Sequence, residues 1–305
     1  MPSFSPTDAA FEGFRFTREK PGAVGAWAGA TLVFNLASAV MGALIGGSTL
    51  VEFQQLTQVQ PFDWIAFGHL LPRLLPALAV TVVINMAGSA IIYPSAVRSF
   101  IGLDRKVSFH IGEDERRILL LMFIYFGIYF VTSVVTGIAF GLIENVIGAL
   151  SADVANFITF VGGLAVVALP SVIIVRLSLA PVIAVDRKRI SLKESWESTK
   201  GHFWPLAGSL ALSGILYFVV VFVGLLLVMT LAQVLSISTH GAIGPNTLTG
   251  ARQTNLADLI KPAAIFGELI TAMMVAVLLP VACGPLVRAY QAYDAPDTPP
   301  VTVPA

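Results

Sequence analysis

Charged residues are scarce in this sequence. Asp, Glu, Lys and Arg make up 12% of its 305 residues and hydrophobic residues 56%, whereas a soluble domain carries roughly a quarter charged residues. That composition cannot coat a globule in water, so it excludes an ordinary soluble domain. The apolar residues instead form six runs that are long enough to cross a hydrocarbon core about 30 Å thick, at 23–47, 74–97, 118–142, 157–182, 206–236 and 263–287.

Cysteine, histidine and catalytic motifs are equally sparse. Cys283 is the single cysteine, which excludes an internal disulfide and a cysteine-based metal cluster. The sequence has no GxSxG elbow, HExxH pair, Walker loop or dinucleotide fingerprint, and its four histidines are scattered. Three consecutive acids are conceivable metal ligands, but they face different directions on a helix: Glu113, Asp114 and Glu115. We therefore predict no enzymatic activity, no cofactor and no metal.

Positive charge is distributed unevenly between the two sides of the six runs. One side holds fifteen of the eighteen Lys and Arg residues, and the other has Arg73, Arg252 and Lys261. Because basic flanks stay in the cytoplasm, we expect both termini there and a multi-pass protein. The formal net charge of zero gives no indication of a nucleic-acid partner.

These patterns predict an all-α fold, a polytopic membrane helical bundle with six transmembrane helices plus interfacial helices. Residues 1–21 form a cytoplasmic amphipathic segment, with Ala10, Phe11 and Phe14 on one helical face. Residues 22–290 form the six-span membrane domain. Residues 291–305, which are rich in proline and lack an apolar period, form a disordered cytoplasmic tail.

The stretch SLKESWESTKGHFWPL, at 191–206, places several charges and two tryptophans between two apolar runs. Ser191 and Glu194 fit a capping box at a helix start, and Gly201 is a natural helix terminator. We expect a short helix at the membrane interface. Basic clusters on the cytoplasmic side also attract anionic lipids, which makes the following residues candidate lipid ligands: Arg98, Arg176, Arg187, Lys188, Arg189, Lys193, Trp196, Lys200, Trp204 and Arg288.

Arg176 has two interpretations. If its helix ran straight on to Asp186, the guanidinium would lie ~15 Å deep, at a high cost in lipid. Otherwise the helix ends near Leu177 and LSLAPVIAV forms an interfacial connector broken at Pro181, so that Arg176 lies at the cytoplasmic boundary. We expect the second interpretation, in which Arg176 lies at the boundary. The alternative is that Arg98, Arg176 and Arg288 together form a rim of three arginines on the cytoplasmic side.

The ends of the second, fourth and sixth runs resemble one another. YPSAVRSF (93–100), LPSVIIVRLSL (169–179) and CGPLVRAY (283–290) each have a proline followed three to six residues later by an arginine. A threefold hairpin repeat is one explanation, and chance matching of short words is the other.

Polar residues inside the predicted spans are few. Asn35 and Asn85 lie in the middle of neighbouring spans, where a hydrogen bond between them would hold the helices together. With Glu268 they could instead line a substrate pathway, because ionisable groups in a membrane interior commonly mark one.

Residues 175–210, VRLSLAPVIAVDRKRISLKESWESTKGHFWPLAGSL, resemble the membrane domain associated with glycerophosphodiester phosphodiesterases and related six-helix bacterial membrane proteins. The matching residues are Arg176, Pro181, Ser195, Trp196, Thr199, Lys200, Gly201, Phe203 and Trp204. The resemblance implies a helical bundle in a bacterial inner membrane, without the phosphodiesterase activity, which belongs to a separate soluble domain. The turn Asp186–Arg187–Lys188–Arg189 departs from the commoner acidic-Gly form.

We therefore predict a non-enzymatic inner-membrane protein that binds membrane lipids, anionic ones among them, or partner proteins at its cytoplasmic face. The alternative is a transporter or permease component for a lipid or small amphiphile, which would need a polar cavity joining Asn35, Asn85 and Glu268. Pairs of glycines with GxxxG spacing, such as Gly137 and Gly141, also allow a homo-oligomer.

Overall fold

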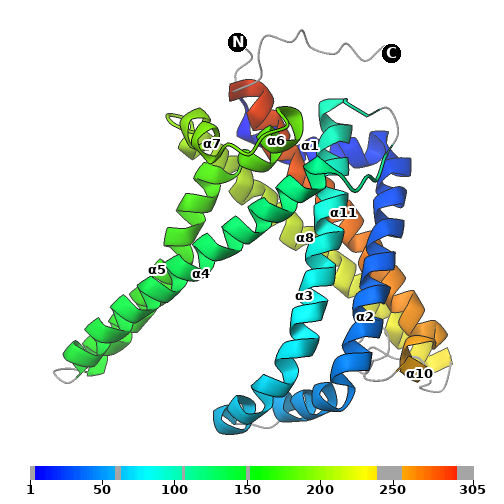
Figure 1. Cartoon of the computed structure of the whole chain (residues 1–305), viewed down its shortest axis with the longest axis vertical. Coiled ribbons are helices and arrows are strands. Elements are labelled where there is room, and N and C mark those ends of the chain that lie inside the picture. Colours follow the sequence, from blue (N-terminus) through cyan, green and yellow to red (C-terminus); the bar gives the residue numbers. More distant parts are fainter. Residues whose placement is uncertain (1–3, 59–62, 105–106, 149–151, 239–255, 294–305) are drawn as a thin grey trace.

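The regular secondary structure is all α-helical in the part of the chain that the computed structural model describes, residues 4–58, 63–104, 107–148, 152–238 and 256–293 (Figure 1). No strand occurs within those ranges. The predicted all-α fold is therefore confirmed. The helices are α1 (Pro6–Glu19), α2 (Pro21–Gln58), α3 (Trp64–Ile101), α4 (Glu113–Gly148), α5 (Ala152–Leu177), α6 (Ala180–Asp186), α7 (Leu192–Ser198), α8 (Phe203–Ser238), α10 (Leu256–Leu259) and α11 (Pro262–Tyr293).

Six of these helical segments are long and apolar enough to cross a membrane, as predicted. Each is longer than the apolar run that predicted it, because flanking polar residues continue the helix. At 1.5 Å per residue, the 38 residues of α2 and of α3 extend ~57 Å, more than a bilayer core needs. The extra length is accommodated by bends, because the last turns of α2 and the first turns of α3 run at an angle to the rest of these helices (Figure 1). The six segments are Pro21–Thr57, Ile65–Ile101, Glu113–Ile143, Phe157–Asp186, Phe203–Val234 and Ala264–Tyr293.

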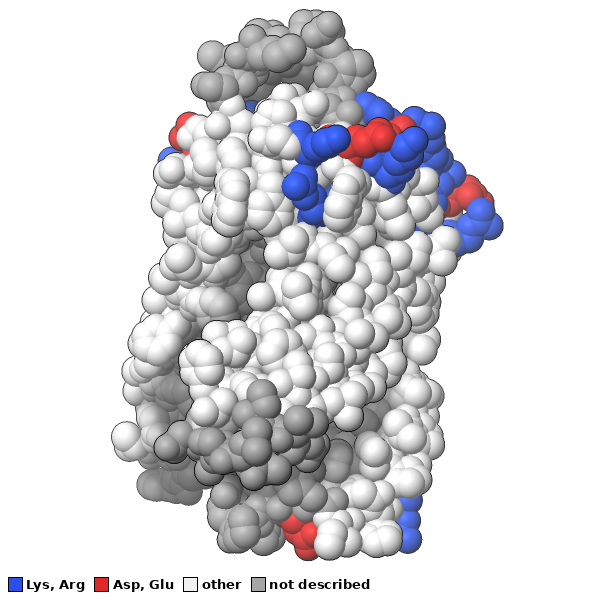
Figure 2. Space-filling view, turned by 90° about the vertical axis from the view of Figure 1, so that its left-hand side faces the viewer, with Lys and Arg blue, Asp and Glu red and all other residues white. Residues whose placement is uncertain are grey.

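Charge marks the two ends of the bundle. We call the end that holds α1, α6 and α7 the basic end, and the end where α2 leads to α3 the opposite end. On the face that Figure 2 shows, Lys and Arg gather at the basic end, and the region between the two ends is almost free of charged residues. The first and last described helices also meet there, since the rings of Phe4 and Tyr293 lie 5.0 Å apart.

Helices α4 and α5 pack on each other and diverge from α3 (Figure 1). Large apolar side chains along this hairpin are exposed, among them Phe126, Phe157 and Phe160. In a protein with six membrane-crossing helices, such side chains face lipid. The hairpin is therefore joined to the bundle mainly near the basic end.

Helix α6 is the most deeply buried element. Residues 180–185 are all fully buried, and α6 contacts α3, α4, α7 and α11. The predicted interfacial connector is wrong in this respect, because the segment packs under the ends of other helices instead of lying at a lipid surface. Pro181 does not break it either, since it lies in the first turn of α6, where a missing N–H group costs nothing.

Helix α1 packs on α11 and α8. The prediction of a helix is confirmed, with Ser5 as its N-cap, but the predicted apolar face is partly wrong. Phe11 is 46% exposed, while Ala9, Ala10, Gly13 and Phe16 form the buried face. Gly13 sets this orientation, because a methyl group there would lie 2.4 Å from the Pro280 carbonyl oxygen.

Helix α11 also continues to Tyr293, three residues into the predicted disordered tail. The rest of that tail, 294–305, lies outside the described residues.

The contact between α1 and α11 predicts the effect of Gly13→Ala. The added methyl group forces the two backbones apart, so we expect the free energy of unfolding to fall by about 1–3 kcal/mol. Gly25→Ala is the matched control, since no atom lies within 4 Å of the new methyl group. Thermal unfolding in detergent measures both variants, and equal stability would contradict the close contact.

Candidate functional site

Three arginines at the basic end each follow a proline inside a long helix, as the sequence pattern indicated. Pro94, Pro170 and Pro285 lie within α3, α5 and α11. The arginines bind different partners: Arg98 the acids around the start of α4, Arg176 the end of α7, and Arg288 the carboxylate of Glu12 in α1 at 2.9 Å. Among the described residues no ion pair or hydrogen bond links one to another. The alternative of a joint three-arginine rim is not what the structure forms.

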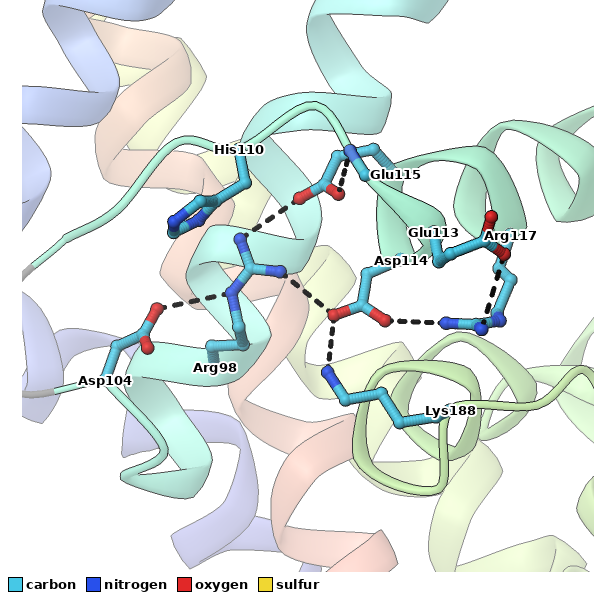
Figure 3. Close-up of a pocket in the computed structure, with 9 residues that line it drawn as sticks. Arg98, Asp104, His110, Glu113, Asp114, Glu115, Arg117 and Lys188 are labelled. Carbon is cyan, nitrogen blue, oxygen red and sulfur yellow. Dashed lines mark hydrogen bonds and ion pairs between the residues drawn. The ribbon is translucent and has the colours of Figure 1, made fainter.

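Arg98 is the centre of a buried ion cluster (Figure 3). Only 7% of the residue is exposed. Its guanidinium donates from Nε to Asp104 at 3.2 Å, from Nη1 to Asp114 at 3.3 Å and from Nη2 to Glu115 at 3.1 Å. A buried charge is tolerated when it is paired and hydrogen-bonded in this way.

Asp114 extends the cluster to two further cations. It accepts from Arg117 at 2.8 Å and from Lys188 at 2.6 Å. Lys188 reaches it from the turn after α6, where its backbone adopts a positive φ of 55°. The cluster therefore ties the end of α3, the start of α4 and the turn after α6 together.

A cavity of about 410 Å³ lies over this cluster (Figure 3). Its charged walls hold three cations, Arg98, Arg117 and Lys188, and four carboxylates. Since acids and bases are mixed and paired, the cavity does not offer an anion a concentration of free positive charge. In the described part of the chain, no three His, Cys, Asp or Glu side chains are grouped to hold a metal ion.

Arg176 lies at the end of its helix, as expected, because α5 ends at Leu177. Its side chain is partly buried against α7 and the start of α8. It donates from Nη1 to the Thr199 carbonyl at 2.8 Å and lies over the rings of Trp196 and Phe203, at 5.6 and 5.0 Å. Its own carbonyl accepts from the hydroxyls of Ser195 and Thr199. We call this group the Arg176 clasp, and it joins α5 to α7 and α8.

Helix α7 begins and ends where the sequence predicts. The Ser191 hydroxyl accepts from the Glu194 N–H at 3.3 Å, and Gly201 has a φ of 85°. The second half of the capping box is not formed, because the Glu194 carboxylate pairs with Arg187 and Arg189 instead.

Four side chains of α7 and its flanks point outward. Lys193 is 85% exposed, Trp204 is 81% exposed, and Lys200 and Trp196 are also exposed. Of the ten candidate lipid ligands, these four are thus available at the surface, while Arg98, Arg176, Lys188, Arg189 and Arg288 are bound to protein groups.

The intramembrane asparagines do not pair with each other, so that prediction is wrong. Asn85 donates to the Ser38 hydroxyl at 3.1 Å and to the Thr81 carbonyl at 2.8 Å. Asn35 lies within hydrogen-bonding reach of Glu268. Both asparagines line a second cavity, of about 370 Å³, between α2, α3, α4 and α11.

Two groups of site residues escaped the sequence reasoning. The first is the set of acids around Arg98, namely Asp104, Asp114 and Glu115, of which the last two are, from the sequence, only conceivable metal ligands. The second is the polar stripe of α2, where Thr31 and Ser38 flank Asn35 at spacings of four and three and so share its face. That spacing was a usable signal.

Comparisons with family models, curated proteins and solved structures gave no match for this chain. The resemblance of residues 175–210 to a known membrane domain therefore stays a prediction. Several of the residues that carry it, Arg176, Ser195, Trp196, Thr199 and Phe203, are those that form the Arg176 clasp.

The ion cluster predicts a large effect for Arg98→Met. The substitution leaves Asp104, Asp114 and Glu115 without their shared cation, so the free energy of unfolding should fall by about 3–5 kcal/mol. Arg116→Gln is the control, because its pair with Glu113 is largely exposed, and such pairs contribute only ~0–1 kcal/mol. Denaturant unfolding in mixed micelles measures both, and similar losses would contradict a structural role for the cluster.

Proposed function

We propose that this multi-pass membrane protein lies in a bacterial inner membrane with its basic end in the cytoplasm, where it binds anionic lipid head groups without catalysing a reaction. The binding site is the α7 surface, which we define as Lys193, Lys200, Trp196 and Trp204. The observation that carries the proposal is the outward position of these cations beside two exposed tryptophans.

The chemistry of the α7 surface suits a lipid interface. Tryptophan favours the boundary between head groups and acyl chains, and Trp204 lies in the first turn of α8, where the chain enters the membrane span. Lysines at that level attract anionic lipids by ~1 kcal/mol each. The surface therefore offers an anchor for the acyl region beside positive charge for the head group.

The other basic residues support the proposal less. Arg98 and Lys188 are held by the ion cluster, Arg176 by its clasp, and Arg288 by Glu12. A charge held in a close ion pair or hydrogen bond gains little from a lipid phosphate, and this applies also to Arg189, which pairs with Glu194. We therefore confine the predicted lipid site to the α7 surface.

Transport is less well supported than lipid binding. Asn35 and Asn85 share a cavity, but Glu268 is not among the residues that line it. The cavity is bounded by the middle parts of the helices and does not include residues from either end of the bundle. A transporter needs access from both sides of the membrane, and this cavity alone does not provide it.

Removing charge from the α7 surface should weaken lipid binding. We expect Lys193→Gln/Lys200→Gln to lower the affinity for phosphatidylglycerol by about 10- to 100-fold, from ~1 kcal/mol per charge. Native mass spectrometry with phosphatidylglycerol titrated into the detergent-solubilised protein measures the change.

The matched control removes two other exposed cations of the basic end, Arg18→Gln/Arg116→Gln. An equal loss of affinity in both double variants would show that total charge matters and that the α7 surface is not a site. Unchanged binding in the first variant would contradict the proposal outright.

The proposed orientation can be tested with new cysteines, because Cys283 is buried and the other positions have none. After expression in cells, Lys200→Cys should react with an impermeant maleimide in inverted membrane vesicles but not in spheroplasts. Gln55→Cys, at the opposite end, should react in spheroplasts but not in inverted vesicles. Both positions are exposed. The reverse pattern would place the basic end outside the cytoplasm.

A further inference from the structure

The second cavity contains a polar group without a partner. Thr31 lines it and is 7% exposed, yet among the described residues its hydroxyl has no hydrogen-bond partner. A buried hydroxyl in an apolar surrounding loses its hydrogen bonds to water and gains nothing in exchange. An unpaired hydroxyl in the wall of a cavity indicates that a ligand completes the site.

Asn85 supplies the cavity with a second free group. The Thr81 carbonyl can only accept, so the amide nitrogen of Asn85 must face it, and the same nitrogen also donates to Ser38. No donor in the described part of the chain reaches the amide oxygen of Asn85. The cavity therefore offers an acceptor from α3 and a hydroxyl from α2.

The remaining wall is neutral and largely apolar. Phe34, Ile92, Tyr93, Met122, Val275 and Leu279 contribute to it, and no Lys, Arg or His does. The wall thus lacks a cation for a phosphate or carboxylate, and it suits an acyl chain. Its volume of about 370 Å³ is in the range of small-molecule sites, ~300–1,000 Å³.

The cavity can be reached from the hydrocarbon region. Asn85 and Ser89 line it and are both exposed on α3. Asn85 precedes Arg98 by thirteen residues, which places it ~20 Å along the helix from the ion cluster. An occupant at this depth comes from the bilayer and must carry its polar group into the membrane interior. The free-energy cost of that transfer is lowest for a small, uncharged head group.

We propose that this cavity binds an uncharged single-chain amphiphile with a hydroxyl-bearing head, of the monoacylglycerol type. Its hydroxyls donate to Asn85 and exchange hydrogen bonds with Thr31, and its chain lies along the apolar wall. The site goes beyond the proposed lipid-binding function, since it differs from the α7 surface in depth and selects against the anionic head groups that the surface attracts.

Photolabelling tests the proposal with the full-length protein in phosphatidylcholine nanodiscs. A diazirine-bearing monoacylglycerol should label peptides of α2 and α3, and monoolein should compete at least about tenfold better than oleate, because the cavity has no cation for a carboxylate. Labelling spread evenly over the lipid-facing helices, or equal competition by oleate, would overturn the proposal.

Thr31→Val supplies the decisive variant. It keeps the shape of the side chain and removes the hydroxyl, so we expect labelling of α2 and α3 to fall about tenfold for the lost pairing while thermal stability without ligand is kept or raised. Ser213→Ala is the control, since Ser213 is also a buried hydroxyl without a partner in the described chain but lines neither cavity. Unchanged labelling in Thr31→Val would overturn the site, and reduced labelling in both variants would do so too.

Discussion

The attachment of the α4–α5 hairpin depends on the polar contacts around α6. Lipid is as apolar as the helices within it, so no hydrophobic force drives membrane helices together, and close packing with polar contacts must do so. In this protein those polar contacts involve the residues immediately before and immediately after α6 in the chain. The Arg176 clasp precedes it, and the bond from Lys188 to Asp114 follows it. Between them, six buried residues fill the space under α3, α4 and α11.

Hydropathy and local helix signals predicted the elements well, and long-range contacts poorly. The six spans follow from the length of the apolar runs, and Ser191 and Gly201 mark α7 correctly because capping depends on neighbouring residues. The burial of α6 could not be predicted, since an apolar segment in a membrane protein packs equally well against lipid or protein. The same holds for Asn85, whose partner on α2 proved to be Ser38 and not Asn35, one turn away.

The structure also distinguishes basic residues that stabilise the fold from basic residues that are exposed, which the sequence alone did not separate. Most arginines of the basic end serve the fold, because each pairs with an acid or donates to a carbonyl, whereas Lys193 and Lys200 remain at the surface beside two tryptophans. Arginine suits the buried role, since its planar group binds several acceptors at once, as Arg98 does. The polar residues that line the second cavity carry no positive charge.

The contact of α1 with α11 fixes the order in which the chain can complete its fold. Glu12 and Arg288 are separated by 276 residues, so during synthesis the part of the α1 contact surface that α11 provides does not exist until the last helix has been made. At about 5–20 residues per second, α1 waits roughly 14–55 s for its partner. During that interval Phe16 can already stack on Trp27 and Phe100. By contrast, the side of α1 around Gly13, which meets Pro280 in α11, is left to the membrane surface or to a chaperone. Helix α1 can therefore complete its packing only after synthesis of α11, the last helix.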